Sequence, residues 1–152
     1  MILHADRAAQ AKTSAAFWLD RLEAAHADLL SAINDLARLM AGPAPSHDVL
    51  VSTRWSVSDA SLARRRLWGQ IHAYLSTVVD RNAATELRHL QDVDIQLIRA
   101  SILHIGSWTT EAILDDWPGY CGASADMRSK LIEAIASEKR LLYPMLKRLA
   151  RR

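Results

Sequence analysis

The chain has 152 residues, and its 19 Lys and Arg nearly balance its 17 Asp and Glu, so the formal charge is only +2. This balance argues against nucleic acid as the partner, and a hydrophobic content of 50% excludes a wholly disordered chain. The length fits one domain, residues 1–152, with a core of its own. With only 5 Gly and 4 Pro in a sequence rich in Ala and Leu, the composition predicts an all-α fold.

A single cysteine, Cys121, excludes an intramolecular disulfide framework and any multi-cysteine metal site. We therefore expect a reducing, cytoplasmic location. The first residues lack the pattern of a signal peptide, and no apolar run reaches the ~18 residues that a bilayer-spanning helix needs. No association with a membrane is expected.

Clusters of Gly and Pro at 42–45 and 118–122, together with the polar run 80–82, predict three breaks between helices. In chain order, helices are expected near 6–41, 57–79, 83–114 and 125–150, and residues 43–56 form a longer connection that carries a turn of its own. The side chains expected to cap the last three helices at their N-termini are Ser58 or Asp59, Asn82, and Ser124.

Each expected helix carries an apolar stripe with few polar interruptions. In the first helix, the stripe over 19–40 is interrupted by His26, and in the third, the stripe over 87–108 has Asp94 at the equivalent step. The stripes expected on the second and fourth helices are Ala63, Leu67, Gln70, Tyr74 and Thr77, and Met127, Leu131, Ala134, Glu138 and Leu141. This repetition indicates a helical hairpin used twice, which packs most simply as an antiparallel up-down four-helix bundle.

Two segments, Leu22-Glu-Ala-Ala-His26-Ala-Asp-Leu29-Leu30 and Glu138-Lys-Arg-Leu-Leu-Tyr143-Pro144, resemble the first and fourth helices of bacterial hemerythrin-like (HHE cation-binding) domains. Members of that family are four-helix bundles with a non-haem di-iron centre. Their ligands are a His on the first helix, a His-x-x-x-Glu pair on the second, a His on the third, and a His-x-x-x-Glu pair before an aromatic–Pro step on the fourth. The resemblance implies the same fold for this chain.

The resemblance carries the family's ligand positions onto His26, Gln70, Tyr74, Asp94, Ala134 and Glu138 of this sequence. Only His26 and Glu138 keep the family's residue type. Amide, phenol and methyl groups elsewhere remove most of the donors that iron needs, so the di-iron centre is expected to be largely lost. As an alternative, a single metal ion, iron by the resemblance, would be held by His26, Asp94, Glu138 and Tyr74.

Without a metal, the same buried groups would pair with one another, His26 lying between Asp94 and Glu138 in charge-assisted hydrogen bonds. In that case His26→Leu, combined with apolar changes at Asp94 and Glu138, is expected to leave the fold intact.

Other sites are less favoured. The spacings Glu23-x-x-His26 and Glu86-x-x-His89 resemble a ferritin-like di-iron pattern, but the expected second helix contains no Glu. Haem ligation by His72 or His104 lacks a Cys-x-x-Cys-His attachment sequence. The run Arg64-Arg65-Arg66 and the basic C-terminus are interpreted as solvated surface.

These patterns favour a non-catalytic binding or regulatory module on a hemerythrin-like scaffold, with no cofactor and no enzymatic activity. Its partner would be an unidentified protein or a small ligand, and a homodimer is compatible with the sequence. One alternative is a residual iron protein that senses or stores oxygen or iron. Another is a small-ligand carrier, in which Thr77 and Ala134 leave internal space.

Overall fold

The computed structural model describes residues 2–151, apart from the side chains at positions 2, 3, 8 and 11–13. Its elements are α1 (Ile2–Met40), α2 (His47–Leu75), α3 (Arg81–Ser107), the short α4 (Thr110–Asp115) and α5 (Trp117–Arg151). No strand occurs in this part of the chain, which confirms the all-α prediction. Within the same residues, no helix carries an apolar stretch long enough to cross a membrane.

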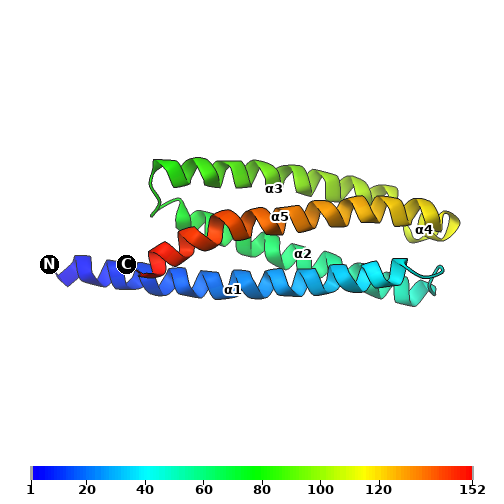
Figure 1. Cartoon of the computed structure of the whole chain (residues 1–152), viewed down its shortest axis with the longest axis horizontal. Coiled ribbons are helices and arrows are strands. Elements are labelled where there is room, and N and C mark those ends of the chain that lie inside the picture. Colours follow the sequence, from blue (N-terminus) through cyan, green and yellow to red (C-terminus); the bar gives the residue numbers. More distant parts are fainter. Residues whose placement is uncertain (1, 152) are drawn as a thin grey trace.

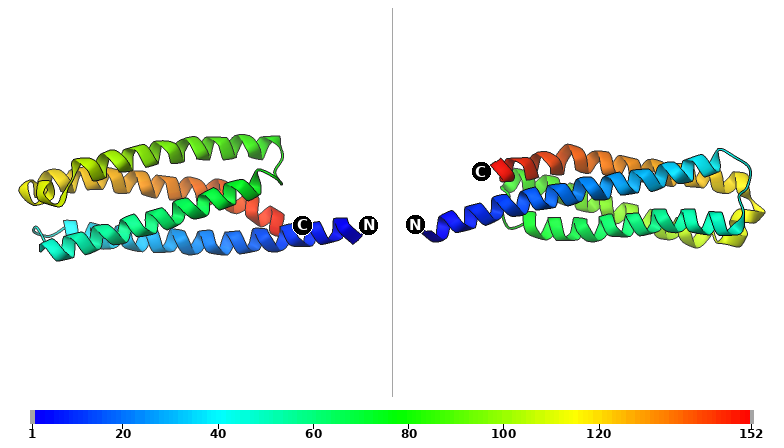
Figure 2. Two further views of the ribbon diagram at one scale, coloured as in Figure 1. Left: turned by 180° about the vertical axis from the view of Figure 1, so that it is seen from behind. Right: turned by 90° about the horizontal axis from the view of Figure 1, so that it is seen from below.

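The long helices α1, α2, α3 and α5 lie alongside one another in an elongated arrangement, and each runs opposite to the long helix before it (Figure 1). α1 packs extensively against both α2 and α5, and α5 also packs against α3 (Figure 2). Over the described residues, α2 and α3 make little close backbone contact. Long side chains therefore have to bridge these two helices.

The central parts of the stripes predicted on the first and third helices are buried, including Leu22, Leu29 and Ile33 on α1 and Leu87, Leu90 and Leu97 on α3. The α3 stripe is only partly buried from position 101 onward. The N-cap of α3 is Asp80 rather than Asn82, since the Asp80 carboxylate accepts the Ala83 N–H at 2.9 Å. α3 ends at Ser107, earlier than predicted, because the backbone at Trp108 leaves the helical conformation (φ −111°, ψ 74°).

α2 begins at His47, so the connection predicted at 43–56 is much shorter than expected. The Ser46 hydroxyl caps this end by accepting the Val49 N–H at 3.4 Å. One turn further on, Leu50 is fully buried, which stabilises the early start. The predicted caps Ser58 and Asp59 lie inside α2 instead.

The loop predicted around the second Gly and Pro cluster is instead the start of α5, which begins at Trp117. Pro118 fits the first helical turn, where its missing N–H has no intrahelical partner to lose. The Asp116 carboxylate accepts the Gly119 N–H at 3.0 Å, and a β-carbon at 119 would collide with that carboxyl group. Ser124, predicted as the cap, is buried within the helix.

The apolar core has separate clusters along the long helices. One includes Leu22, Leu67, Leu90 and Leu142, and the next includes Leu29, Leu97, Leu131 and Ala134. A third, beside α4, is formed by Leu50, Ile113 and Tyr120. On α1, α3 and α5, the boundary between the first two clusters is occupied by a buried polar residue, which places the candidate site there.

Candidate functional site

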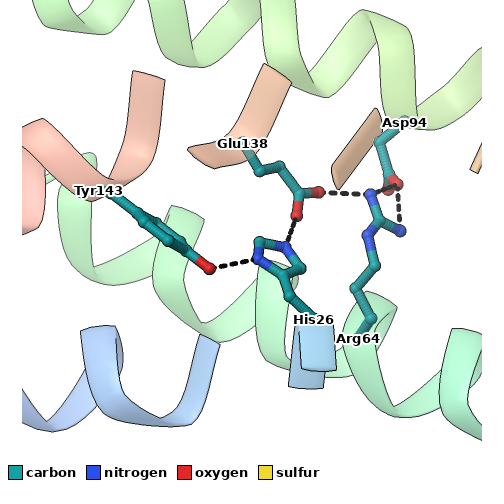
Figure 3. A network of polar contacts seen from close by, with 5 residues as sticks. All are labelled: His26, Arg64, Asp94, Glu138 and Tyr143. Atoms are coloured by element: carbon teal, nitrogen blue, oxygen red, sulfur yellow. Dashed lines mark hydrogen bonds and ion pairs between the residues drawn. The ribbon is translucent and has the colours of Figure 1, made fainter. Parts of the chain in front are cut away.

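A layer of buried polar side chains, one from each long helix, crosses the interior (Figure 3). Its members, with their exposed fractions, are His26 (1%), Arg64 (2%), Asp94 (7%) and Glu138 (3%). Each lies on the same helical face as buried leucines one turn away, so the burial of the apolar stripe carries the polar group into the interior. We call these four residues the polar layer.

Arg64 of α2 is the centre of the polar layer. Its Nη2 donates a hydrogen bond to Oε1 of Glu138 on α5. Its Nη1 and Nη2 also donate to Oδ1 of Asp94 on α3, at 3.3 and 3.2 Å. Among the described residues, Arg64 Nε is the buried side-chain polar atom left without a partner. One guanidinium group thus joins two carboxylates through charge-assisted hydrogen bonds and bridges α2 to α3 and α5 (Figure 3).

His26 of α1 completes the connection on the other side of Glu138. Its Nε2 lies 2.5 Å from Glu138 Oε2, and its Nδ1 lies 2.6 Å from the hydroxyl oxygen of Tyr143. Burial, with Glu23 and Glu138 nearby, raises the pKa of Tyr143 to about 12, so this hydroxyl keeps its proton at neutral pH. It can donate to neutral His26 and accept from the imidazolium form, which satisfies Nδ1 in both states.

The charges of the polar layer do not balance when Asp94 and Glu138 are both ionised and Arg64 is the only cation. An additional proton on His26 or Asp94 makes the layer neutral. Burial raises the pKa of Asp94 above its ordinary value of 3.8, and repulsion from Glu138 adds to the rise, whereas the charge and hydrogen bond of Arg64 lower it. Desolvation is the largest of these effects, so the protonated form of Asp94 is favoured relative to the unfolded chain.

The raised pKa of Asp94 predicts how the stability of the protein changes with pH. A carboxyl group whose folded-state pKa is raised contributes stability that is complete below its unfolded pKa and is lost as pH rises through its folded pKa. We therefore expect the wild type to lose stability relative to Asp94→Asn as the pH rises from about 3 to about 7. The quantity measured is the free energy of unfolding of each protein in denaturant. Asp92→Asn removes a carboxylate from the exposed face of the same helix and serves as the control. A difference that grows in favour of the wild type would instead mean that Arg64 outweighs the burial of Asp94.

The structure places the predicted metal ligands in different surroundings. His26, Asp94 and Glu138 share the polar layer, but Asp94 is connected to the others through Arg64. Tyr74 packs against the first apolar cluster, where partial burial raises its pKa. It does not belong to the polar layer.

Three further positions named from the sequence also lie outside the polar layer. Gln70 is exposed and lines an outer groove between α1 and α2. Ala134 is buried in the second apolar cluster. Thr77, expected to leave internal space together with Ala134, is exposed in the turn after α2.

The interpretation of Arg64 as solvated surface is wrong, and the cause is the orientation of α2. The buried stripe of this helix consists of Arg64, Leu67, Trp68, Ile71 and Leu75, rather than of Ala63, Leu67, Gln70, Tyr74 and Thr77. A signal was available, because the spacing of Leu67, Ile71 and Leu75 extends back by one turn to Arg64. Its charge, within a run of three arginines, pointed to the surface instead.

The donor set does not fit a resident metal ion. Both carboxylate oxygens of Glu138 and both ring nitrogens of His26 are engaged by other side chains, and a guanidinium lies between the two carboxylates. A cation at that position would be repelled by Arg64, which remains charged at any ordinary pH. In the part of the chain that the structure describes, no group of three or more His, Cys, Asp or Glu side chains is arranged to hold a metal ion.

The chain was compared with known proteins in three ways. A scan against protein-family models found no match, and neither the curated proteins nor the solved structures contained a matching chain.

Proposed function

We propose that this chain is a hemerythrin-like, antiparallel up-down four-helix bundle in which an internal ion-pair layer replaces the metal centre, and that it acts as a non-catalytic binding or regulatory module. The observation that carries the proposal is the Arg64 guanidinium bound to both Asp94 and Glu138. The alternating long helices support the kinship, as do His26 and Glu138 at the family's first-helix and fourth-helix ligand positions.

The replacement is chemically sensible. In a di-iron centre, metal ions neutralise the buried carboxylates, and a fixed guanidinium can supply positive charge in the same region. Unlike a metal ion, it offers no open coordination position and no redox change. The polar layer would therefore preserve the scaffold without the oxygen chemistry that the family resemblance implies.

Binding through the outer surface is supported by large apolar side chains exposed on α2 and α3. Trp55, Ile102 and Leu103 have exposed fractions of 71%, 64% and 70%. Exposed apolar side chains of this size are common where another protein docks. A protein partner, including a second copy of this chain, is thus compatible with the proposed module.

The proposal is tested by metal analysis of protein purified without chelators, combined with its absorption spectrum. We expect far less than one iron atom per chain and no ligand-to-metal charge-transfer band. Iron at one or more atoms per chain, with such a band, would support the residual iron protein instead.

A variant extends this test. Arg64→Ala removes the central cation and releases the Asp94 and Glu138 carboxylates, so that these two groups, with His26 beside Glu138, can bind a divalent ion. We expect the variant to bind Co²⁺, followed by its visible absorption bands, at least about tenfold more tightly than the wild type, since removing a repelling charge a few ångströms from the metal ion is worth more than the ~1.4 kcal/mol of a tenfold change. Arg64→Ala combined with His26→Leu is the matched control and should lose this gain. Equal Co²⁺ binding by all three proteins would contradict a replaced metal centre.

A further inference from the structure

A second polar site lies at the end of the bundle near α4, away from the polar layer. It is a cavity of about 60 Å³ between α2, α3 and α5. Basic and hydroxyl side chains line much of it, and no Asp or Glu is among the residues that line it. Those used below are Arg54, Ser58, Ser61, Ser101, His104 and Arg128.

The basic groups converge on Tyr120, which is buried. The guanidinium carbon of Arg54 lies 5.5 Å from the centre of the Tyr120 ring, and the His104 ring stacks on that ring at 5.9 Å. Arg128 Nε donates a hydrogen bond to the carbonyl oxygen of Ser124 at 3.2 Å. α2, α3 and α5 each bring a basic side chain to the same cavity.

The electrostatics of the cavity indicate a positive interior. Burial raises the pKa of Tyr120, while Arg54, a hydrogen bond with Ser124 and Arg128 act in the opposite direction. Burial lowers the pKa of His104, and the charge of Arg54 lowers it further. Carboxylates contribute to neither shift, so Arg54 acts on both groups, and Arg128 acts on Tyr120, without a compensating acid.

The donors of the cavity are also largely unused. Within the described chain, Arg54 forms no ion pair or hydrogen bond and contacts the Tyr120 ring instead. The contacts of Arg128 are the Ser124 carbonyl and the sulfur of Met40. The hydroxyls of Ser58, Ser61 and Ser101 likewise have no hydrogen-bond partner among the described residues. These groups are partly or fully exposed, so water satisfies them in the free protein, and an anion that enters the cavity can replace that water with charge-assisted hydrogen bonds.

We infer that this cavity binds a phosphate group, either as free phosphate or as the terminal group of a phosphomonoester. The planar guanidinium groups of Arg54 and Arg128 match phosphate oxygens, and the serine hydroxyls approach from α2 and α3. A buried water needs ~10–15 Å³ of such space, so about 60 Å³ holds roughly five small atoms, the size of one phosphate group. This site goes beyond the proposed function, because it contains no residue of the polar layer.

The experiment compares sodium phosphate, glycerol phosphate and sodium chloride at matched ionic strength, by thermal unfolding and isothermal titration calorimetry of the full chain. We expect a saturable rise in Tm with phosphate but not with chloride. Arg54→Gln and Arg128→Gln should each weaken binding at least about tenfold, because hydrogen bonds to charged groups have that magnitude. Arg66→Gln, an exposed arginine on α2, is the matched control and should bind like the wild type.

A further variant guards against loss of folding at the arginines. Ser61→Ala with Ser101→Ala keeps both charges, should retain the helical circular-dichroism signal and should still weaken phosphate binding several-fold. Binding of inorganic phosphate alone would assign free phosphate, and binding of glycerol phosphate would assign a phosphomonoester head group. Equal effects of phosphate and chloride, or unchanged binding in Arg54→Gln and the double serine variant, would overturn the inference. Either result leaves the metal test of the polar layer unaffected.

Discussion

Arg64→Met is expected to destabilise the protein by about 3–5 kcal/mol, measured as the free energy of unfolding in urea, since removing one partner of a buried ion pair leaves its counterpart uncompensated. Here the substitution affects two carboxylates. Asp94 loses the side chain that connects it to Glu138, and Glu138 keeps only its contact with His26. Because small domains have a total stability of roughly 5–15 kcal/mol, such a loss is a large part of it.

The matched control is Arg66→Met, which removes the same side chain two residues along α2, from an exposed position. We expect its effect to stay within about 0.5 kcal/mol, as for most surface substitutions. If the two substitutions lower the free energy of unfolding equally, the ion pairs of Arg64 do not stabilise the protein in the way that their burial indicates.

A concerted variant is expected to recover most of this loss. His26→Leu, Arg64→Met, Asp94→Leu and Glu138→Met together replace the polar layer by apolar side chains. Buried ion pairs exchanged for packed apolar groups are often neutral or stabilising by about 1–4 kcal/mol, so the four changes should be several kcal/mol more stable than Arg64→Met alone. The measurement is again urea unfolding, with circular dichroism to establish the helix content.

This variant also corrects the one suggested by the sequence, which changed His26, Asp94 and Glu138 but left Arg64 in place. That triple variant would bury a guanidinium without either of its carboxylate partners. We expect it to be less stable than the fourfold variant. If the fourfold variant instead loses as much unfolding free energy as its four single changes added together, the interactions of the polar layer outweigh the cost of burying its charges.

Much of the fold follows from apolar periodicity in the sequence. On α1 and α3, large apolar side chains, mostly leucines, recur at every third or fourth position around His26 and Asp94, so the buried face could be predicted together with these two residues. On α5, the same reasoning identified Glu138 correctly as a buried group.

The pairing within the site could not be predicted, because it depends on a residue type that is normally exposed. The charge of Arg64 assigns it to the surface, whereas its position one turn from Leu67 assigns it to the core. Only the facing carboxylates of other helices decide between the two. Assigning the wrong face to α2 also moved Gln70 and Tyr74 into the expected site.

Helix ends were predicted poorly for a related reason. The sequence signals for a break at Pro118 and Gly119 also suit the first turn of a helix capped by Asp116. Leu50 stabilises the early start of α2 by packing against Ile113 and Tyr120, and these two residues lie far along the chain. Local signals are therefore ambiguous where distant packing decides.

The position of the polar layer also determines how the helices can move. Displacing a long helix along its axis by one turn, about 5.4 Å, would bring an apolar residue to the level of the polar layer. The polar residue of that helix would then lie among apolar side chains without a partner. One axial alignment therefore satisfies all four helices at once. Conformational changes that accompany binding should leave this middle level fixed and be accommodated by bending or fraying towards the two ends of the molecule.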